Sequence, residues 1–180
     1  MAITINGSGT IGGVSVGGLP DGIVDTDMLA SGAITDALLP AGSVLQVVNT
    51  TQNGTPLNTT SSTLQASGFY IDITPISTSS KIYIIATFNT KVAYTTGGQG
   101  GRYTIKRNGT TNLFDQNEGQ FWYTVNNIGA VHLPVTLHAL DSPATTSSTR
   151  YEVYYCSFNS GVAGIENWGK FLITAMEIAG

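Results

Sequence analysis

The sequence predicts an all-β protein: a β-sandwich of jelly-roll type at residues 43–180, preceded by an extended glycine-rich arm at residues 1–42 with one or two short helical turns. Charged residues make up only 10% of the chain, against about 25% in typical soluble domains, so Thr, Ser, Asn and Gly supply most of the polarity. From residue 43 onward, strand-like runs alternate with turn residues, and no amphipathic helical pattern interrupts them.

The first 42 residues lack the side chains needed for a core of their own. All sixteen Phe, Tyr and Trp residues lie at or after Phe69, whereas this segment carries nine of the 22 glycines. Ordering a backbone costs about 1–2 kcal/mol per residue, and the burial available here is too small to offset that cost. We therefore expect an arm that becomes ordered against another chain.

Two copies of a T-D-x-L unit, at residues 26–29 and 35–38, predict the helical turns of the arm. Thr and Asp suit a helix N-terminus, where a hydroxyl caps free amides and a carboxylate interacts favourably with the helix dipole. We interpret the units as docking turns; the alternative is a linker with incidental capping residues. The apolar arm residues expected to contact a partner are Ile11, Val14, Val16, Leu19, Met28, Leu29, Leu38 and Leu39.

Gly7, Gly9 and Gly12 match the G-x-G-x-x-G spacing of dinucleotide-binding proteins. That motif requires a helix after its third glycine, because the helix N-terminus holds the pyrophosphate. Residues 12–20 contain four glycines, a proline and two β-branched valines, which oppose a helix. We therefore expect no cofactor, and we assign the glycines a conformational role in a chain that follows a partner's surface.

The expected strands of the sandwich follow in order along the chain. The run SVLQVV is the first, and GFYIDITP and KIYIIATF follow a Thr/Asn/Ser-rich connection that ends near residue 63. Asn108-Gly109 predicts a hairpin within GRYTIKRNGTTNLF, because a type I′ turn needs positive φ at both positions. The alternating run AVHLPVTLHAL and the runs RYEVYYCSF and KFLITAMEIA complete the domain.

No motif in the chain predicts catalysis or metal binding. Cys156 is the single cysteine and is interpreted as a small apolar strand residue. His132 and His138 are six residues apart on one extended strand, or about 20 Å, which is too far to share a metal ion. Glycosidase-like carboxylate pairs cannot be placed from sequence, and the common hydrolase motifs are missing. We expect a protein that is not an enzyme and that binds no metal.

The net charge of −4 and the pI near 4.8 argue against nucleic acid and anionic membranes as partners, since both select clustered Lys and Arg. No apolar run approaches the roughly 18 residues of a membrane span, and no signal peptide is expected.

The densest aromatic stretch is GQFWYTVNN, in which strand alternation places Phe121 and Tyr123 opposite Trp122. At least one of these rings must therefore face solvent or a neighbouring subunit. The aromatic residues considered for a subunit contact or for stacking on a glycan are Tyr94, Trp122 and Trp168.

Taken together, the leader TINGSGTIGGVSVGGLPDGIVDTDMLASGAIT, the opening GSVLQVV and the phrases ITPISTSSKI, LDSPATTSSTRYEV and LITAMEIAG resemble a family of small virion proteins and fibre tips of tailed bacteriophages of aquatic bacteria. The resemblance implies a trimeric β-sandwich knob that attaches to the particle through its N-terminal segment. It also implies a non-enzymatic structural role in a virion that is assembled in the host cytoplasm.

Only about ten residues, 32–42, separate the expected arm from the knob, whereas a long tail fibre carries a shaft at this place. We therefore expect a homotrimeric capsid cement or decoration protein, or a short head fibre, whose arm binds the major capsid protein. The alternative is a tail-fibre adhesin that binds carbohydrate on the host surface.

Overall fold

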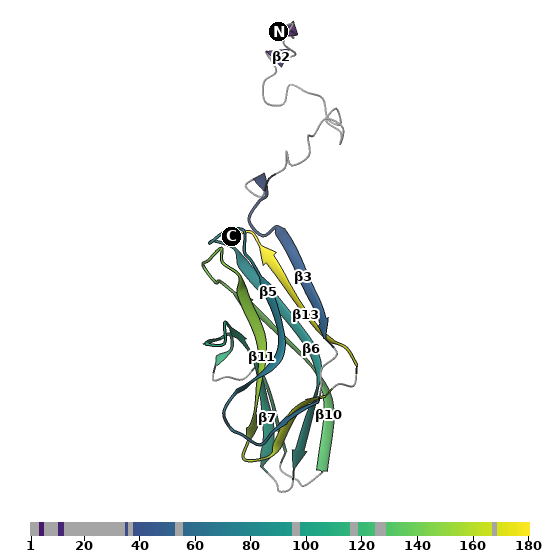
Figure 1. The fold of residues 1–180 in the computed structure, drawn as a ribbon. Coiled ribbons are helices and arrows are strands. Elements are labelled where there is room, and N and C mark those ends of the chain that lie inside the picture. Colours follow the sequence, from purple (N-terminus) through teal and green to yellow (C-terminus); the bar gives the residue numbers. More distant parts are fainter. Residues whose placement is uncertain are drawn as a thin grey trace. The chain divides into compact units, whose positions relative to one another are not determined.

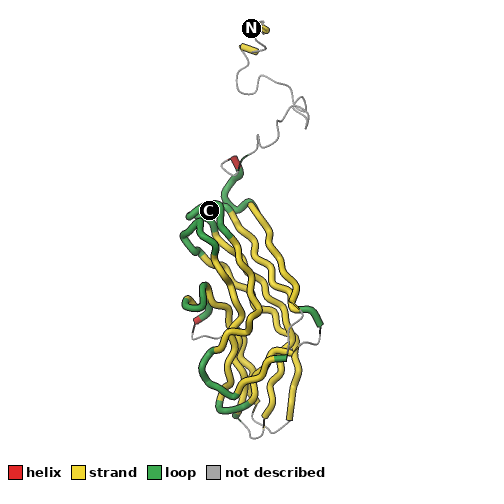
Figure 2. Tube along the Cα trace, in the orientation of Figure 1, coloured by secondary structure: helices red, strands yellow, loops and turns green. Residues whose placement is uncertain are grey.

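The computed structural model describes residues 4–5, 11–12, 35, 38–52, 56–94, 98–115, 119–124, 129–166 and 169–180. The chain divides into two units, Met1–Leu39 and Pro40–Gly180. Strands dominate the described residues, as Figure 2 shows, and the predicted all-β class is confirmed. Within the described part of the chain, no helix has the length and the apolar content that crossing a membrane requires.

In the described part of the chain, thirteen strands form three antiparallel sheets, and their bounds are as follows. They are β1 Thr4–Ile5, β2 Ile11–Gly12, β3 Val44–Gln52, β4 Leu57–Thr59, β5 Gln65–Ile73, β6 Lys81–Tyr94, β7 Gln99–Arg107, β8 Thr111–Asn112, β9 Gln120–Thr124, β10 Gly129–Asp141, β11 Thr149–Phe158, β12 Val162–Glu166 and β13 Phe171–Ile178.

In the N-terminal unit, β1 pairs with β2, with Thr4 opposite Gly12 and Ile5 opposite Ile11. Gly12, the third glycine of the G-x-G-x-x-G spacing, is therefore a strand residue. Further along, the amide of Leu38 donates a hydrogen bond to the carbonyl of Thr35 over 2.9 Å, so the first and last residues of the second T-D-x-L unit are in contact.

The larger sheet of the second unit has six strands in the order β3-β13-β6-β12-β4, with β10 also paired to β6 (Figure 1). Strand β6 is central because β10 pairs with one of its edges from Ile82 to Tyr94. Its other edge pairs first with β13 and then with β12. The nearly continuous apolar run of β6 fits this position, since a central strand is shielded along both edges.

The smaller sheet has five strands in the order β5-β11-β7-β8, with β9 also paired to β7. The β7–β8 hairpin turns at Asn108 and Gly109, whose φ angles are 49° and 71°. The hairpin predicted from this dipeptide is thus confirmed. The Asn108 side chain further fixes the turn, because its Oδ1 accepts a hydrogen bond from the amide of Arg150 at 2.9 Å.

One hydrophobic core lies between the inner faces of the two large sheets. The Phe69 ring from β5 meets the Phe88 ring from β6 at 6.2 Å and the Phe171 ring from β13 at 5.4 Å, measured between centroids. Phe88 also contacts Tyr103 from β7, with centroids 5.9 Å apart. Side chains from both sheets therefore interlock in a sandwich-like arrangement.

Candidate functional site

The outer face of the six-stranded sheet carries apolar side chains that no part of the described chain covers. Met176 of β13 lies opposite Val47 of β3 and, on its other side, opposite Tyr83 of β6. Tyr83 in turn lies opposite Leu140 of β10. These four residues form a continuous line across four strands, which we call the apolar row.

The direction of the apolar row follows from strand alternation. Ala175 and Glu177, the neighbours of Met176, have no solvent exposure, and neither do Ile82 and Ile84, the neighbours of Tyr83. The row therefore points away from the core. Val47 is 53% exposed and Leu140 57% exposed, so the two ends of the row are open to solvent.

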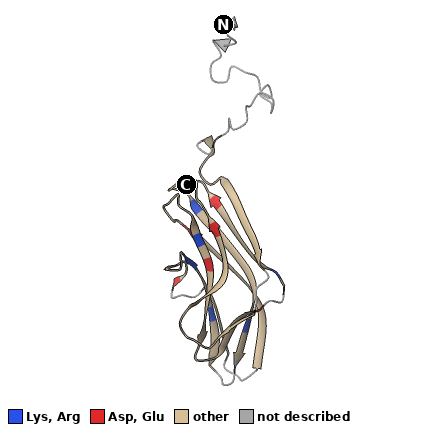
Figure 3. Cartoon of the chain, viewed as in Figure 1, with Lys and Arg blue, Asp and Glu red and all other residues tan. Residues whose placement is uncertain are grey.

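Most residues around the apolar row are apolar or neutral, and one exception is Lys81, an exposed residue of β6 two positions before Tyr83 on the same face. Val44 and Leu172, which are 53% and 44% exposed, lie on the same outer face. Next to the row, the ring of His138 contacts that of Tyr83, with centroids 6.2 Å apart. Figure 3 shows how few charges β3, β13 and β10 carry. The two acidic residues on these strands, Asp141 and Glu177, are both largely shielded from solvent.

An outer face with so few charges is suited to contact with another protein surface. Interface cores are depleted in charged residues and enriched in Tyr and Met, because removing a charge from water costs far more than removing an apolar group. The threonines here add little desolvation cost, since some already pair with each other: the hydroxyl oxygens of Thr87 and Thr136 lie 3.1 Å apart.

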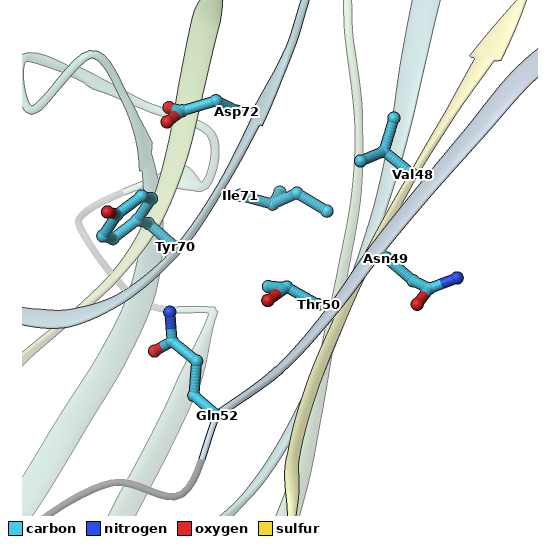
Figure 4. Close-up of a pocket in the computed structure, with 7 residues that line it drawn as sticks. All are labelled: Val48, Asn49, Thr50, Gln52, Tyr70, Ile71 and Asp72. Atoms are coloured by element: carbon cyan, nitrogen blue, oxygen red, sulfur yellow. The ribbon is translucent and has the colours of Figure 1, made fainter.

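A separate hollow of about 250 Å³ opens between β3 and β5 at the side of the sandwich (Figure 4). Val48 and Ile71 point into the space between these strands, whereas Asn49 points away from it. The carboxylate of Asp72 lines the hollow but is engaged by Arg150, with Nε and Oδ1 2.8 Å apart. This hydrogen bond raises the pKa of the Arg150 guanidinium above its ordinary value. The hollow therefore presents no reactive pair of groups.

The structure places only some of the residues predicted to contact partners. Leu38 is 66% exposed, Leu39 is half-buried and Ile11 lies in β2. Tyr94 ends strand β6, and nothing further is described of its side chain. The predicted contact residues that lie outside the described part of the chain are Val14, Val16, Leu19, Met28, Leu29 and Trp168.

Trp122 lies on the inner side of β9, where it is partly buried against the core. Its neighbours Phe121 and Tyr123 contact each other on the opposite face, with ring centroids 6.0 Å apart. Tyr123 is 52% exposed. The alternation predicted for this stretch is therefore present, and the more exposed ring is that of Tyr123.

Sequence reasoning missed the apolar row, because its members come from four separate strands. Within the described residues, no group of three or more His, Cys, Asp or Glu side chains is arranged to hold a metal ion. The sequence matches no protein-family model, and a comparison with curated proteins gave no match either.

Proposed function

We propose that the protein is a homotrimeric structural protein of a bacteriophage virion, either a capsid cement protein or a short head fibre. Residues 1–42 bind the major capsid protein, and residues 43–180 form a knob. The observation that carries the proposal is the apolar row, because a monomer would leave Val47, Tyr83, Leu140 and Met176 in contact with water. The resemblance of the leader and of the strand phrases to phage virion proteins supplies the context.

Association of knobs through the apolar row strengthens attachment without any new contact by the arm. Three arms held in one trimer bind with a raised effective concentration, so the particle retains all of them more tightly than it retains one. The area buried between arm and capsid subunits then stabilises the assembled shell over its separated subunits. No catalytic step is part of this role.

We also propose that the sandwich is of jelly-roll type. The proposal is supported by the order β3-β13-β6-β10 in the larger sheet and β5-β11-β7-β9 in the smaller one. The first and last long strands are neighbours in this order, as a pair of Greek keys requires. Jelly rolls recur in viral capsid proteins and lectins, although a fold alone does not determine a function.

The oligomer is tested by placing charge on the apolar row of the full chain. We expect the double substitution V47K/L140K to convert the trimer to a monomer in light scattering coupled to size-exclusion chromatography. The matched control is Ile76→Lys, which charges a side chain of similar exposure, 47%, in the connection after β5. An unchanged mass for V47K/L140K, or equal dissociation by I76K, would contradict association through this face.

Capsid attachment is tested separately. A full chain with serine at Met28, Leu29, Leu38 and Leu39 should remain a trimer and fail to co-sediment with capsids that lack the protein. The unaltered chain should co-sediment with them. Retained capsid binding by the serine variant would remove these residues from the attachment site, and no capsid binding by either chain would overturn the virion role.

A further inference from the structure

The outer face of the five-stranded sheet carries a line of cations stacked on aromatic rings. The guanidinium carbon of Arg102 lies 4.7 Å from the centroid of the Phe158 ring and 5.4 Å from that of Phe121. The ammonium nitrogen of Lys106 lies 5.0 Å from the centroid of the Tyr154 ring. Cation–π contacts of this kind hold flexible side chains in place, so less conformational entropy is lost when a ligand binds them.

Register and alternation show why these side chains share one face. Tyr103 and Ile105 of β7 are fully buried in the core, so Arg102 and Lys106 point outward. Cys156 of β11 lies opposite Arg102. It is nevertheless only 2% exposed, although it belongs to the outward-facing set of its strand.

The segment before β5 runs beside this face and encloses a pocket. The carbonyl of Ser61 accepts a hydrogen bond from the amide of Ser157 at 2.7 Å, which ties the segment to β11. The pocket has a volume of about 330 Å³, and its lining residues are Ser62, Thr63, Leu64, Arg102, Lys106 and Cys156.

The lining of this pocket selects an anion. Two of the seven Lys and Arg residues of a chain with net charge −4 lie on it, and its lining, as far as the structure describes the chain, includes no carboxylate. The nearest acid in register, Glu152 opposite Lys106, uses Oε1 to accept a hydrogen bond from the amide of Gly68 at 2.8 Å. Anionic groups are therefore favoured beside Arg102 and Lys106 over neutral ones.

The spacing of the two cations indicates an extended ligand. Positions 102 and 106 are four residues apart on one strand, or about 13 Å, which exceeds the reach of a single carboxylate. Ser62 and Thr63, which also line the pocket, bring polar groups to it. The half-exposed Tyr123 ring adds an amphipathic surface on the same sheet face, of the kind that packs against the apolar side of a sugar ring.

We propose that this pocket binds an acidic oligosaccharide, with the carboxylate groups of successive or alternate uronic acid units at Arg102 and Lys106. Single-stranded nucleic acid shares the anionic and stacking chemistry. It is disfavoured because such sites track the phosphate backbone with a continuous cationic groove, whereas this chain is acidic overall. Saccharide binding here requires neither the trimer nor the capsid contact proposed above.

The test is a calorimetric titration of the full chain with a tetramer of galacturonic acid. Neutral maltotetraose and an oligothymidylate of similar length serve as comparison ligands. We expect binding of the uronate tetramer alone, with an affinity that falls as salt is added. Absence of uronate binding, equal binding of maltotetraose, or tighter binding of the oligothymidylate would each overturn the proposal.

Substitutions locate the site. We expect K106Q and R102Q each to weaken uronate binding about tenfold, as loss of a charge-assisted hydrogen bond predicts. The matched control K170Q removes the same charge from an exposed residue that does not line the pocket and should bind as the unaltered chain does. R102Q removes a stacked planar group as well as a charge. R102K, which keeps the charge, is therefore measured beside it. Equal affinities for K106Q and K170Q would place the ligand elsewhere.

Discussion

Oε1 of Glu177 accepts a hydrogen bond from the backbone amide of Ile76 at 2.7 Å, although Glu177 is fully buried. Its other carboxylate oxygen accepts a hydrogen bond from the side-chain amide of Gln46 on β3. The carboxylate therefore ties β13 and β3 to the β5–β6 connection at one end of the sandwich. A buried acid is tolerated here because several donors surround it.

We expect Glu177→Ala to lower the free energy of unfolding by about 3 kcal/mol, because it leaves buried amide donors without an acceptor. Glu177→Gln retains one oxygen acceptor and should cost less than the alanine variant. Urea unfolding followed by tryptophan fluorescence measures both values. Asp115→Ala, at an exposed position, is the control and should change stability little. Equal losses for E177A and D115A would contradict the role given to Glu177.

The same site predicts a loss of stability in acid. Burial raises the pKa of Glu177, but hydrogen bonds from Gln46 and from the amides of Ile76 and Ser77 outweigh this effect, and the pKa lies below its ordinary value of 4.5. Because the folded state binds the proton more weakly than the unfolded state, the stabilisation is present above about pH 5 and is lost as the pH falls through the folded pKa.

Urea unfolding between pH 7 and pH 3 checks this expectation. The unaltered chain should lose stability more steeply below pH 5 than E177Q does, since the glutamine cannot take up a proton. Parallel curves for the two chains would show that other carboxylates cause the acid dependence.

A second, partly buried contact joins the two sheets. Nη1 of Arg107 on β7 lies 2.7 Å from Oδ2 of Asp141 on β10, and the same oxygen accepts a hydrogen bond from the Tyr151 hydroxyl on β11 at 2.7 Å. Burial, together with this bond, raises the pKa of Tyr151 above its ordinary value, so the phenol stays protonated and donates at neutral pH.

We expect Asp141→Ala to cost about 3 kcal/mol, because it leaves the partly buried Arg107 charge unpaired. Tyr151→Phe should cost about 1 kcal/mol, as the loss of one hydrogen bond predicts. The double variant D141A/Y151F should cost less than the sum of the two losses, since both substitutions remove the same hydrogen bond. Strict additivity in urea unfolding would argue against coupling between the two residues.

The elements that the sequence predicted well are those with strong local patterns. Asn108-Gly109 specifies its turn because both residues tolerate positive φ, and the apolar run of β6 specifies a central strand. Strand β4 was instead placed in a connection, because its three residues form a strand only through pairing with β12. The turn after β11 was also missed. Ser160 has a φ of 59° there, and serine seldom adopts the left-handed region.

The candidate surfaces could not be predicted from the sequence, because they too depend on pairing between strands. Val47, Tyr83, Leu140 and Met176 become neighbours only through strand register, which is fixed by the complete sheet and not by any single strand. Alternation within β9 could place Phe121 and Tyr123 on one face. It could not identify Arg102 of β7 as the neighbour of Phe121.

Gly100 offers a prediction that tests the pairing of β7 with β9 directly. A Cβ atom at this position would lie 1.9 Å from the carbonyl oxygen of Trp122, and backbone at that distance must move. Gly100 lies opposite Tyr123 in register, so the strand that must move is the one that carries the exposed ring. Glycine is thus required here by the close approach of another backbone.

We expect Gly100→Ala to lower the free energy of unfolding by about 2–3 kcal/mol and to speed amide hydrogen exchange along β9. Gly129→Ala is the matched comparison. A Cβ atom there meets nothing within 4 Å, so this variant is destabilised only by the backbone strain of a φ of 73°, about 1 kcal/mol. Hydrogen exchange followed by mass spectrometry separates the two, because only G100A should expose the amides of Phe121–Tyr123. If G100A proves as mild as G129A and leaves β9 protected, then β9 does not pack against β7 as closely as the structure describes.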